Sequence, residues 1–195
     1  MSTWNNPEPE VVLAVSSAGR IVGATLGNDI NLRDVEGRSA LLLSQAKDNN
    51  GSCAIGPLLR LFDCLDGVGA PFTLDTVRRM TVSLLVQGPE GFRLEGASSI
   101  GMVSGDPADL VAQMVNTRHR YPDGAVLFLG TKFAPVEDRD APGKGFTHKT
   151  GDIVTIAAPG LGRLVNRMTP TDRCEPWAFG VAAPMRNLAR RGVLG

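Results

Sequence analysis

The sequence predicts a β-rich α+β domain, and three observations support that fold class. Its 23 glycines and 13 prolines divide the apolar residues into short runs, which is typical of many short strands joined by turns. Several of these runs are β-branched or alternate apolar with polar residues, the period of a half-buried strand. The length of 195 residues suits one domain with a substantial core. We therefore expect a single domain over residues 1–195, in which residues 170–195 form a C-terminal extension.

The first expected element is a β-hairpin. Residues 11–16 (VVLAVS) and 20–26 (RIVGATL) are short apolar runs on either side of Ser17-Ala18-Gly19. A turn with a glycine between two such runs favours a pair of antiparallel strands.

Three acidic residues lie at the ends of this hairpin. Glu8 and Glu10 are two positions apart, so on a strand both carboxylates point to the same face. Asp29 follows the second run. Two acids on one face repel unless positive charge lies between them, and carboxylate oxygens are hard ligands suited to Mg²⁺, Mn²⁺ or Ca²⁺. A solvated strand face, with Asp29 in a turn, is the alternative interpretation of this spacing.

The segment after the hairpin is expected to contain a helix and then a polar loop. Residues 31–44 carry apolar side chains at helical spacing, but Gly37 weakens the middle, so the helix should be short or broken. Lys47 opens the turn-rich segment 47–52, which predicts that this lysine lies on a loop.

Three polar side chains near the motifs have two interpretations each. Arg33 would lie one helical turn after Asp29, where it could contact a substrate or form a salt bridge with Asp29 or Glu36. His148 could face a cavity or cap a turn. His119 is interpreted as a cap or surface histidine more readily than as a catalyst.

The middle of the chain predicts strands followed by one helix. Strands are expected at residues 58–62, 80–86 and 92–96, the last two forming a second hairpin. A helix over residues 106–120 should begin at Asp106-Pro107, where aspartate suits the N-cap and proline suits the first turn.

The last third predicts strands and a closing helix. Residues 125–129 (AVLFL) are apolar throughout and predict a buried strand that ends at Gly130-Thr131. Two further strands are expected at 153–156 and 161–168, and a short basic helix at 185–192.

Several motifs then agree in order with one known family. They are the Glu-x-Glu pair, the NDxxxRD segment (Asn28, Asp29, Arg33, Asp34), the lysine of AKD, Gly56-Pro57 and Gly130-Thr131. Together they resemble the C-terminal catalytic domain of the fumarylacetoacetate hydrolase family, over about residues 5 to 168. The resemblance implies a mixed β-sheet roll with a few short helices, and a homodimer.

The resemblance also implies a site. Glu8, Glu10 and Asp29 would hold a divalent metal, usually Mg²⁺, with Mn²⁺ or Ca²⁺ possible, and Lys47 would be the active-site lysine beside a small 2-oxo acid. Implied substrate-binding residues are Arg33, Asp48, Gly130 and Thr131.

The short interval from Glu10 to Asp29 resembles the branch that dehydrates 2-keto-3-deoxy sugar acids such as arabinonate and xylonate. The implied reaction proceeds through a metal-bound enolate to 2,5-dioxopentanoate, with Lys47 as a base of lowered pKa. That branch has an acidic partner, an upstream glutamate, and because only seven residues precede Glu8 we expect the N-terminal part to be missing. Two alternatives stay open: hydrolysis of a carbon–carbon bond in an acylpyruvate, and an incomplete fragment that binds metal and 2-oxo acid without turnover.

Composition argues against other partners. Lysine plus arginine equals aspartate plus glutamate at 20 each, which provides no overall field to attract nucleic acid or an anionic membrane. Cys53, Cys64 and Cys174 lack C-x-x-C spacing and predict reduced thiols of a cytoplasmic protein. No apolar stretch approaches the roughly 20 residues that a spanning helix needs.

Overall fold

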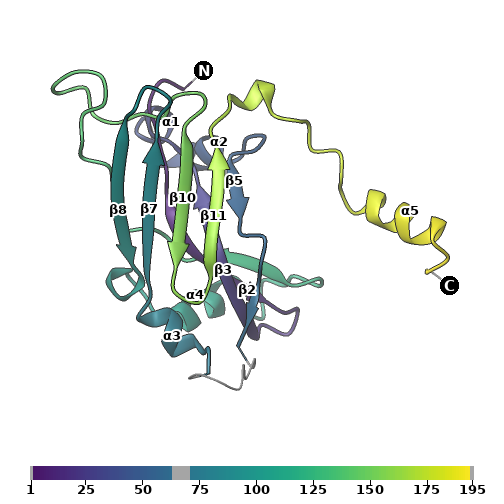
Figure 1. The fold of residues 1–195 in the computed structure, drawn as a ribbon. Helices are drawn as coiled ribbons and strands as arrows, with labels where there is room; N and C mark the ends of the chain where they lie inside the picture. The colour runs from purple at the N-terminus through teal and green to yellow at the C-terminus, as the bar shows by residue number, and fades with distance from the viewer. Residues whose placement is uncertain (1, 63–70, 194–195) are drawn as a thin grey trace.

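The computed structural model describes residues 2–62 and 71–193. Within them two β-sheets pack face to face and short helices lie at their ends (Figure 1). The expected β-rich α+β roll with few short helices is confirmed. The strand pairs of the described residues are all antiparallel, so the mixed sheet that the resemblance implied is wrong in that detail.

The first sheet contains the expected N-terminal hairpin. Its strand order is β5-β3-β2-β9, and β6 pairs with β3 as well. The strands are β2 (Pro9–Val15), β3 (Ile21–Asp29), β5 (Cys53–Ile55), β6 (Arg60–Leu61) and β9 (Ala125–Phe128). The strand expected at 58–62 is therefore limited to two residues. The strand expected at 125–129 exists but is not buried throughout, because β9 is an edge strand and the side chain of Val126 faces solvent.

The second sheet has four strands in the order β11-β10-β7-β8, so it joins two hairpins through the pair of β10 and β7. Its strands are β7 (Thr81–Gln87), β8 (Arg93–Ser99), β10 (Ile153–Ala158) and β11 (Gly162–Arg167), which confirms the strands expected there. A short ribbon of β1 (Asn5–Asn6) and β4 (Asn31–Leu32) stands beside the sheets.

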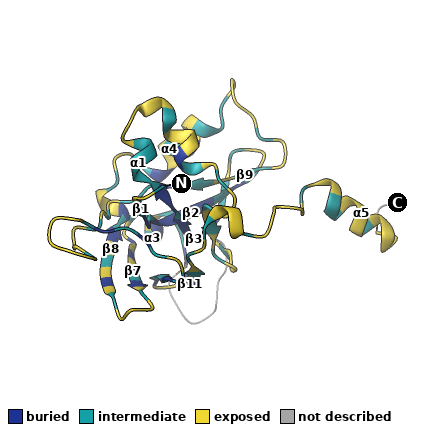
Figure 2. Cartoon of the chain, turned by 90° about the horizontal axis from the view of Figure 1, so that it is seen from above, coloured by how far each residue is buried: buried dark blue, intermediate teal, exposed yellow. Residues whose placement is uncertain are grey.

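The hydrophobic core lies between the two sheets. Alternate residues of each strand point inward, as the two-residue period of a strand requires. The inner face of β2 contributes Val11 and Leu13, and that of β7 contributes Val82 and Leu84, all nearly or completely buried. Burial of this apolar surface supplies the main favourable free energy of folding. Figure 2 shows the buried residues concentrated along these strands.

The helices are short. They are α1 (Arg33–Glu36), η1 (Ala40–Leu42), α2 (Leu43–Lys47), α3 (Leu74–Arg78), η2 (Ile100–Met102), α4 (Pro107–Met114), η3 (Thr171–Arg173) and α5 (Ala182–Arg190). The helix expected over 31–44 is broken after α1, where Gly37 ends the first piece.

The helix expected over 106–120 begins as predicted but is too short. Asp106 caps it by accepting a hydrogen bond from the Ala108 backbone at 2.8 Å. The helix ends at Met114, because Val115 is extended and the side-chain amide of Asn116 donates to the carbonyls of Ala112 and Gln113. His119 lies beyond this end and is exposed.

The C-terminal extension projects from the sheets, and α5 lies well away from them (Figures 1 and 2). Trp177 and Phe179, which precede α5, are 84% and 67% exposed. Cys64 lies outside the described residues. In the described parts of the chain, no helix is both long and apolar enough to cross a membrane.

Candidate metal centre

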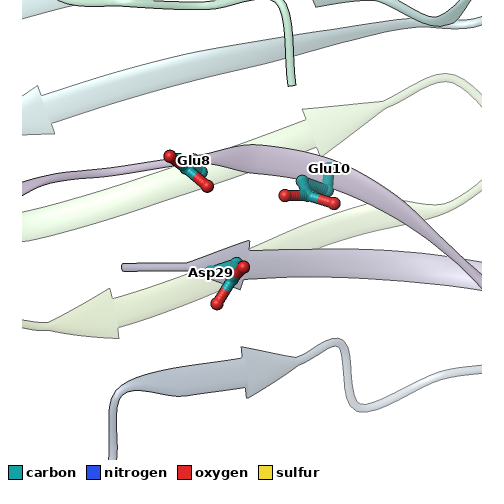
Figure 3. Close-up of side chains that lie close together, drawn as sticks. All are labelled: Glu8, Glu10 and Asp29. Carbon is teal, nitrogen blue, oxygen red and sulfur yellow. The ribbon is translucent and has the colours of Figure 1, made fainter. Parts of the chain in front are cut away.

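The N-terminal hairpin brings the three acidic side chains to one face. In the register of β2 and β3, Glu10 lies opposite Gly27, and the Asp29 backbone N–H donates to the carbonyl of Glu8 at 3.1 Å. Residues opposite each other share a face, as do residues two apart. The carboxylates therefore project from the face of the hairpin opposite to the core (Figure 3).

These carboxylates converge, and we call them the acid cup (Glu8, Glu10 and Asp29). One oxygen from each lies within 4.8 Å of the others. Glu10 is buried, whereas the side chains of Glu8 and Asp29 are 19% and 25% exposed. Three carboxylate oxygens at this spacing are a donor set that fits a hard divalent cation.

Lys47 supplies the positive charge beside the acid cup. Its Nζ lies 2.5 Å from Glu8 Oε2 and 2.9 Å from Asp29 Oδ2, and donates to the Asp29 carbonyl at 3.0 Å. Lys47 is the last residue of α2, so the expected loop position is wrong: the helix continues to the lysine before the polar turn begins.

Burial alone would lower the pKa of Lys47, but the hydrogen bonds to Asp29 and Glu8 outweigh it and raise the pKa. The expectation that the pKa of Lys47 is lowered, as would suit a base, is therefore wrong. The reason is that two carboxylates stabilise the ammonium directly.

Glu10 indicates that the acid cup is short of positive charge. Burial raises its pKa to about 7, and the neighbouring Asp29 and Glu8 add to this effect. The Gly130 backbone N–H, 2.6 Å from Glu10 Oε2, acts in the opposite direction. A buried carboxylate that favours its proton despite a nearby lysine is a group that a divalent cation would stabilise in its charged form.

Gly130 contacts the acid cup directly, whereas no hydrogen bond joins Thr131 or Asp48 to it in the described structure. Gly130, at φ +86°, directs its N–H to Glu10, so this turn orients a cup residue. Thr131 Oγ1 accepts a hydrogen bond from the Phe133 backbone at 3.1 Å. Asp48 directly follows Lys47 and is exposed.

Arg33 is paired within its own helix. Its Nη1 lies 3.0 Å from Glu36 Oε2, which is one of the interpretations that the sequence left open. Its guanidinium also lies 5.6 Å from the ring centre of Trp4.

Sequence reasoning missed Asn31. Its Nδ2 donates to Glu8 Oε1 at 2.9 Å and to Glu36 Oε2 at 2.8 Å. The residue is 2% exposed, and its Oδ1 is buried without a hydrogen-bond partner in the described structure. Its position two after Asp29 would have indicated the same face, but the segment was expected to be helical.

Gly27 leaves room for the side chains of Phe128 and Val12 to lie against β3. A Cβ at this position would lie 2.4 Å from Phe128 Cε1 and 2.5 Å from Val12 Cγ2. No real side chain tolerates such distances. The absence of a side chain at Gly27 therefore leaves room for the ring of Phe128, two residues before Gly130, to lie across β2.

His148 belongs to a separate buried network. Its Nδ1 lies 3.0 Å from Asp152 Oδ2, and Asp152 also forms a two-fold ion pair with Arg139 at 2.6 and 2.7 Å. The His148 backbone N–H donates to the Asn5 carbonyl at 3.2 Å. The network thus fixes the strand that leads to Glu8.

The family is now defined by comparison as well as by geometry. The sequence profile described as Fumarylacetoacetate (FAA) hydrolase C-terminal matches residues 11–169. The chain belongs to this family. The match begins directly after Glu10, so two of the three acids lie just outside it.

Two curated proteins are similar in sequence to most of this chain. A 2-dehydro-3-deoxy-D-arabinonate dehydratase of Saccharolobus solfataricus is 30% identical over 84% of this chain and 49% of its own length. A probable 2-keto-3-deoxyxylonate dehydratase of Haloferax volcanii is 31% identical over 86% of this chain and 52% of its own. The chain spans about half the length of these relatives.

A solved structure shows a similar fold. It is a 2-keto-3-deoxy-D-arabinonate dehydratase complexed with magnesium and 2,5-dioxopentanoate, with a TM-score of 0.69 and 27% identity. The similarity covers 85% of this chain and 53% of that one.

Proposed function

We propose that this chain is the catalytic part of a Mg²⁺-dependent dehydratase that converts a 2-keto-3-deoxy sugar acid to 2,5-dioxopentanoate. The observation that carries the proposal is the convergence of Glu8, Glu10 and Asp29 within 4.8 Å on one face of the hairpin. The two dehydratase relatives, and the dehydratase solved with magnesium and 2,5-dioxopentanoate, support the substrate class. Because the chain spans about half of their length, the complete activity is part of the proposal.

In this proposal the acid cup holds the metal. Bound Mg²⁺ supplies Lewis acidity, which stabilises negative charge on the carboxylate and keto oxygens of a 2-oxo acid. Gly130 holds Glu10 in place through its backbone N–H. Thr131 and Asp48 are the proposed contacts of the substrate.

Lys47 is the proposed base. It takes a proton from C3 of the substrate, and the C4 hydroxyl takes a proton from a general acid, the role that the resemblance gives to an upstream glutamate, and leaves as water. A proton then moves from C5 to C3, and the hydroxyl proton of the resulting C5 enol moves to C4, which leaves an aldehyde at C5. A base must first be neutral, and the pKa of Lys47 is raised by hydrogen bonds to Asp29 and Glu8 despite its burial. If Glu8 and Asp29 held a cation, part of their negative charge would be neutralised, and their effect on the pKa of Lys47 would weaken.

Metal binding is tested by thermal unfolding. Mg²⁺ should raise the Tm of the wild type by ligand linkage and leave the double variant Glu8→Gln/Glu10→Gln unaffected. An equal rise in both proteins would contradict the proposed site.

The role of Lys47 is tested with Lys47→Met. The variant should lose about 10²-fold or more in kcat on a 2-keto-3-deoxypentonate, the typical effect of removing a general base. It should bind Mg²⁺ at least as well as the wild type, since the ammonium that competes for the carboxylates is gone.

Lys144→Met is the matched control, because Lys144 is exposed and lies outside the acid cup. Its kcat should equal that of the wild type. Near-normal turnover by Lys47→Met would place the base elsewhere, and turnover of an acylpyruvate instead of the sugar acid would contradict the reaction.

The raised pKa of Lys47 favours a second candidate function, because a lysine that holds its proton is a poor base. In this candidate the chain binds Mg²⁺ and a 2-oxo acid without turnover. Pyruvate binding in the presence of Mg²⁺, with no turnover until the upstream half of a relative is added in trans, would support this candidate.

A further inference from the structure

The two oxygens of Glu8 have different partners. Oε2 faces the ammonium of Lys47 at 2.5 Å, and Oε1 accepts from Asn31 Nδ2 at 2.9 Å. Lys47 competes electrostatically with any cation that enters the acid cup, whereas the amide of Asn31 is neutral. Asn31 is therefore the partner that can orient Glu8 without opposing a cation.

Asn31 is itself held in place. Its second Nδ2 hydrogen bond reaches Glu36 Oε2 at 2.8 Å, and Arg33 Nη1 holds the same oxygen at 3.0 Å. These contacts link the acid cup to α1. Both hydrogens of the amide are used, so its rotation is fixed, and with it the rotation of the Glu8 carboxylate.

Asn31 differs from its structural neighbour Asn6 in its link to the acid cup. The Oδ1 of each is buried without a partner among the described residues, so that feature does not indicate a role. The hydrogen bond from Asn31 Nδ2 to Glu8 Oε1 is what points to the acid cup.

We infer that Asn31 is a positioning residue that orients Glu8 for cation binding. The inference rests on the proposed metal site. Residues that orient ligating groups typically change metal affinity by 10- to 100-fold when they are replaced.

The experiment compares Asn31→Leu with Asn6→Leu by calorimetric titration with Mg²⁺. Asn6 is a close match, because it lies opposite Asn31 in the β1–β4 register, is also buried, and also has an unpartnered Oδ1. In the described structure no hydrogen bond joins its side chain to a carboxylate. Asn31→Leu should weaken the Kd for Mg²⁺ by about 10-fold or more, and Asn6→Leu should leave it within about two-fold.

The Tm without metal separates orientation from folding. The two leucine variants should have similar Tm values. A difference in their Kd for Mg²⁺ then reflects the orientation of the Glu8 carboxylate and not a loss of folding. Asn31→Ser is the second variant, should Asn31→Leu fail to fold. Its side chain is polar but too short to reach Glu8, so the same loss of affinity for Mg²⁺ is expected.

The experiment distinguishes failure of the proposed metal site from failure of the inference about Asn31. A wild type that binds no Mg²⁺ overturns the proposed site and this inference together. A wild type that binds Mg²⁺, with folded Asn31 variants of equal affinity or with an equal loss in Asn6→Leu, overturns this inference alone.

Discussion

His148 is a buried histidine that the fold keeps neutral. Burial lowers its pKa, although the hydrogen bond to Asp152 acts against this effect. The unfolded chain takes up the proton near the ordinary value of 6.5, and the folded protein only at lower pH. Below pH 6.5 the unfolded state therefore binds more protons, so this stability is complete above 6.5 and is lost as the pH falls.

His148→Asn should reduce that loss. The asparagine amide can donate to Asp152 from nearly the same place as Nδ1, but it cannot be protonated. Between pH 6.5 and 5 the Tm of the variant should fall less steeply than that of the wild type, measured by circular dichroism in matched buffers. Parallel slopes would show that His148 does not contribute to the acid sensitivity.

The acids and the lysine could be predicted from the sequence, whereas their supporting residues could not. A two-residue spacing on a strand places Glu8 and Glu10 on one face whatever else surrounds them. The role of Asn31 depends on a turn from β3 into β4 that the helical spacing of residues 31–44 concealed. The backbone N–H of Gly130 is invisible to any argument from side-chain types, although it contacts Glu10.

At the scale of elements, the contact of the Phe128 side chain of β9, which reaches across β2 to Gly27 of β3, is a point of tight packing. Gly27→Ala would place a methyl group against Phe128 and Val12, where the nearest atoms lie at 2.4 and 2.5 Å. Overpacking of this kind typically costs about 1–3 kcal/mol. Chemical denaturation should show a lower midpoint for the variant.

Gly101→Ala is the control for this substitution, because the nearest atom to its Cβ, the Arg78 carbonyl oxygen, would lie at 3.5 Å, an ordinary contact. It should unfold close to the wild-type midpoint. Equal behaviour of the two variants would mean that β9 moves away without cost.

Strands were easier to predict than helices in this chain. The hairpin of β2 and β3 follows from apolar runs around a glycine turn, and β7 and β8 follow from alternation. The end of α4 depends on Asn116, whose side chain replaces the backbone partners of Ala112 and Gln113. Such competition between a side chain and the helix is decided by local geometry, which spacing does not contain.

At the scale of the whole molecule, the C-terminal extension should contribute little to stability. Residues around Trp177 and Phe179 are exposed, and none of the described residues of α5 is buried. Removal of residues 177–195 should leave the Tm within about 1–2 °C of the full chain, because no core surface is lost. A drop of many degrees in calorimetry would show that the extension packs on the sheets in solution.

The hairpin of β2 and β3 has its core on one side and its acids on the other. Neighbouring positions along β2, such as Glu10 and Val11, therefore contribute to different properties of the molecule. A substitution of Val11 acts on the packing between the two sheets, while a substitution of Glu10 acts on the charge of the acid cup. Protein engineering can thus adjust core packing and cup charge independently within the same seven residues of β2.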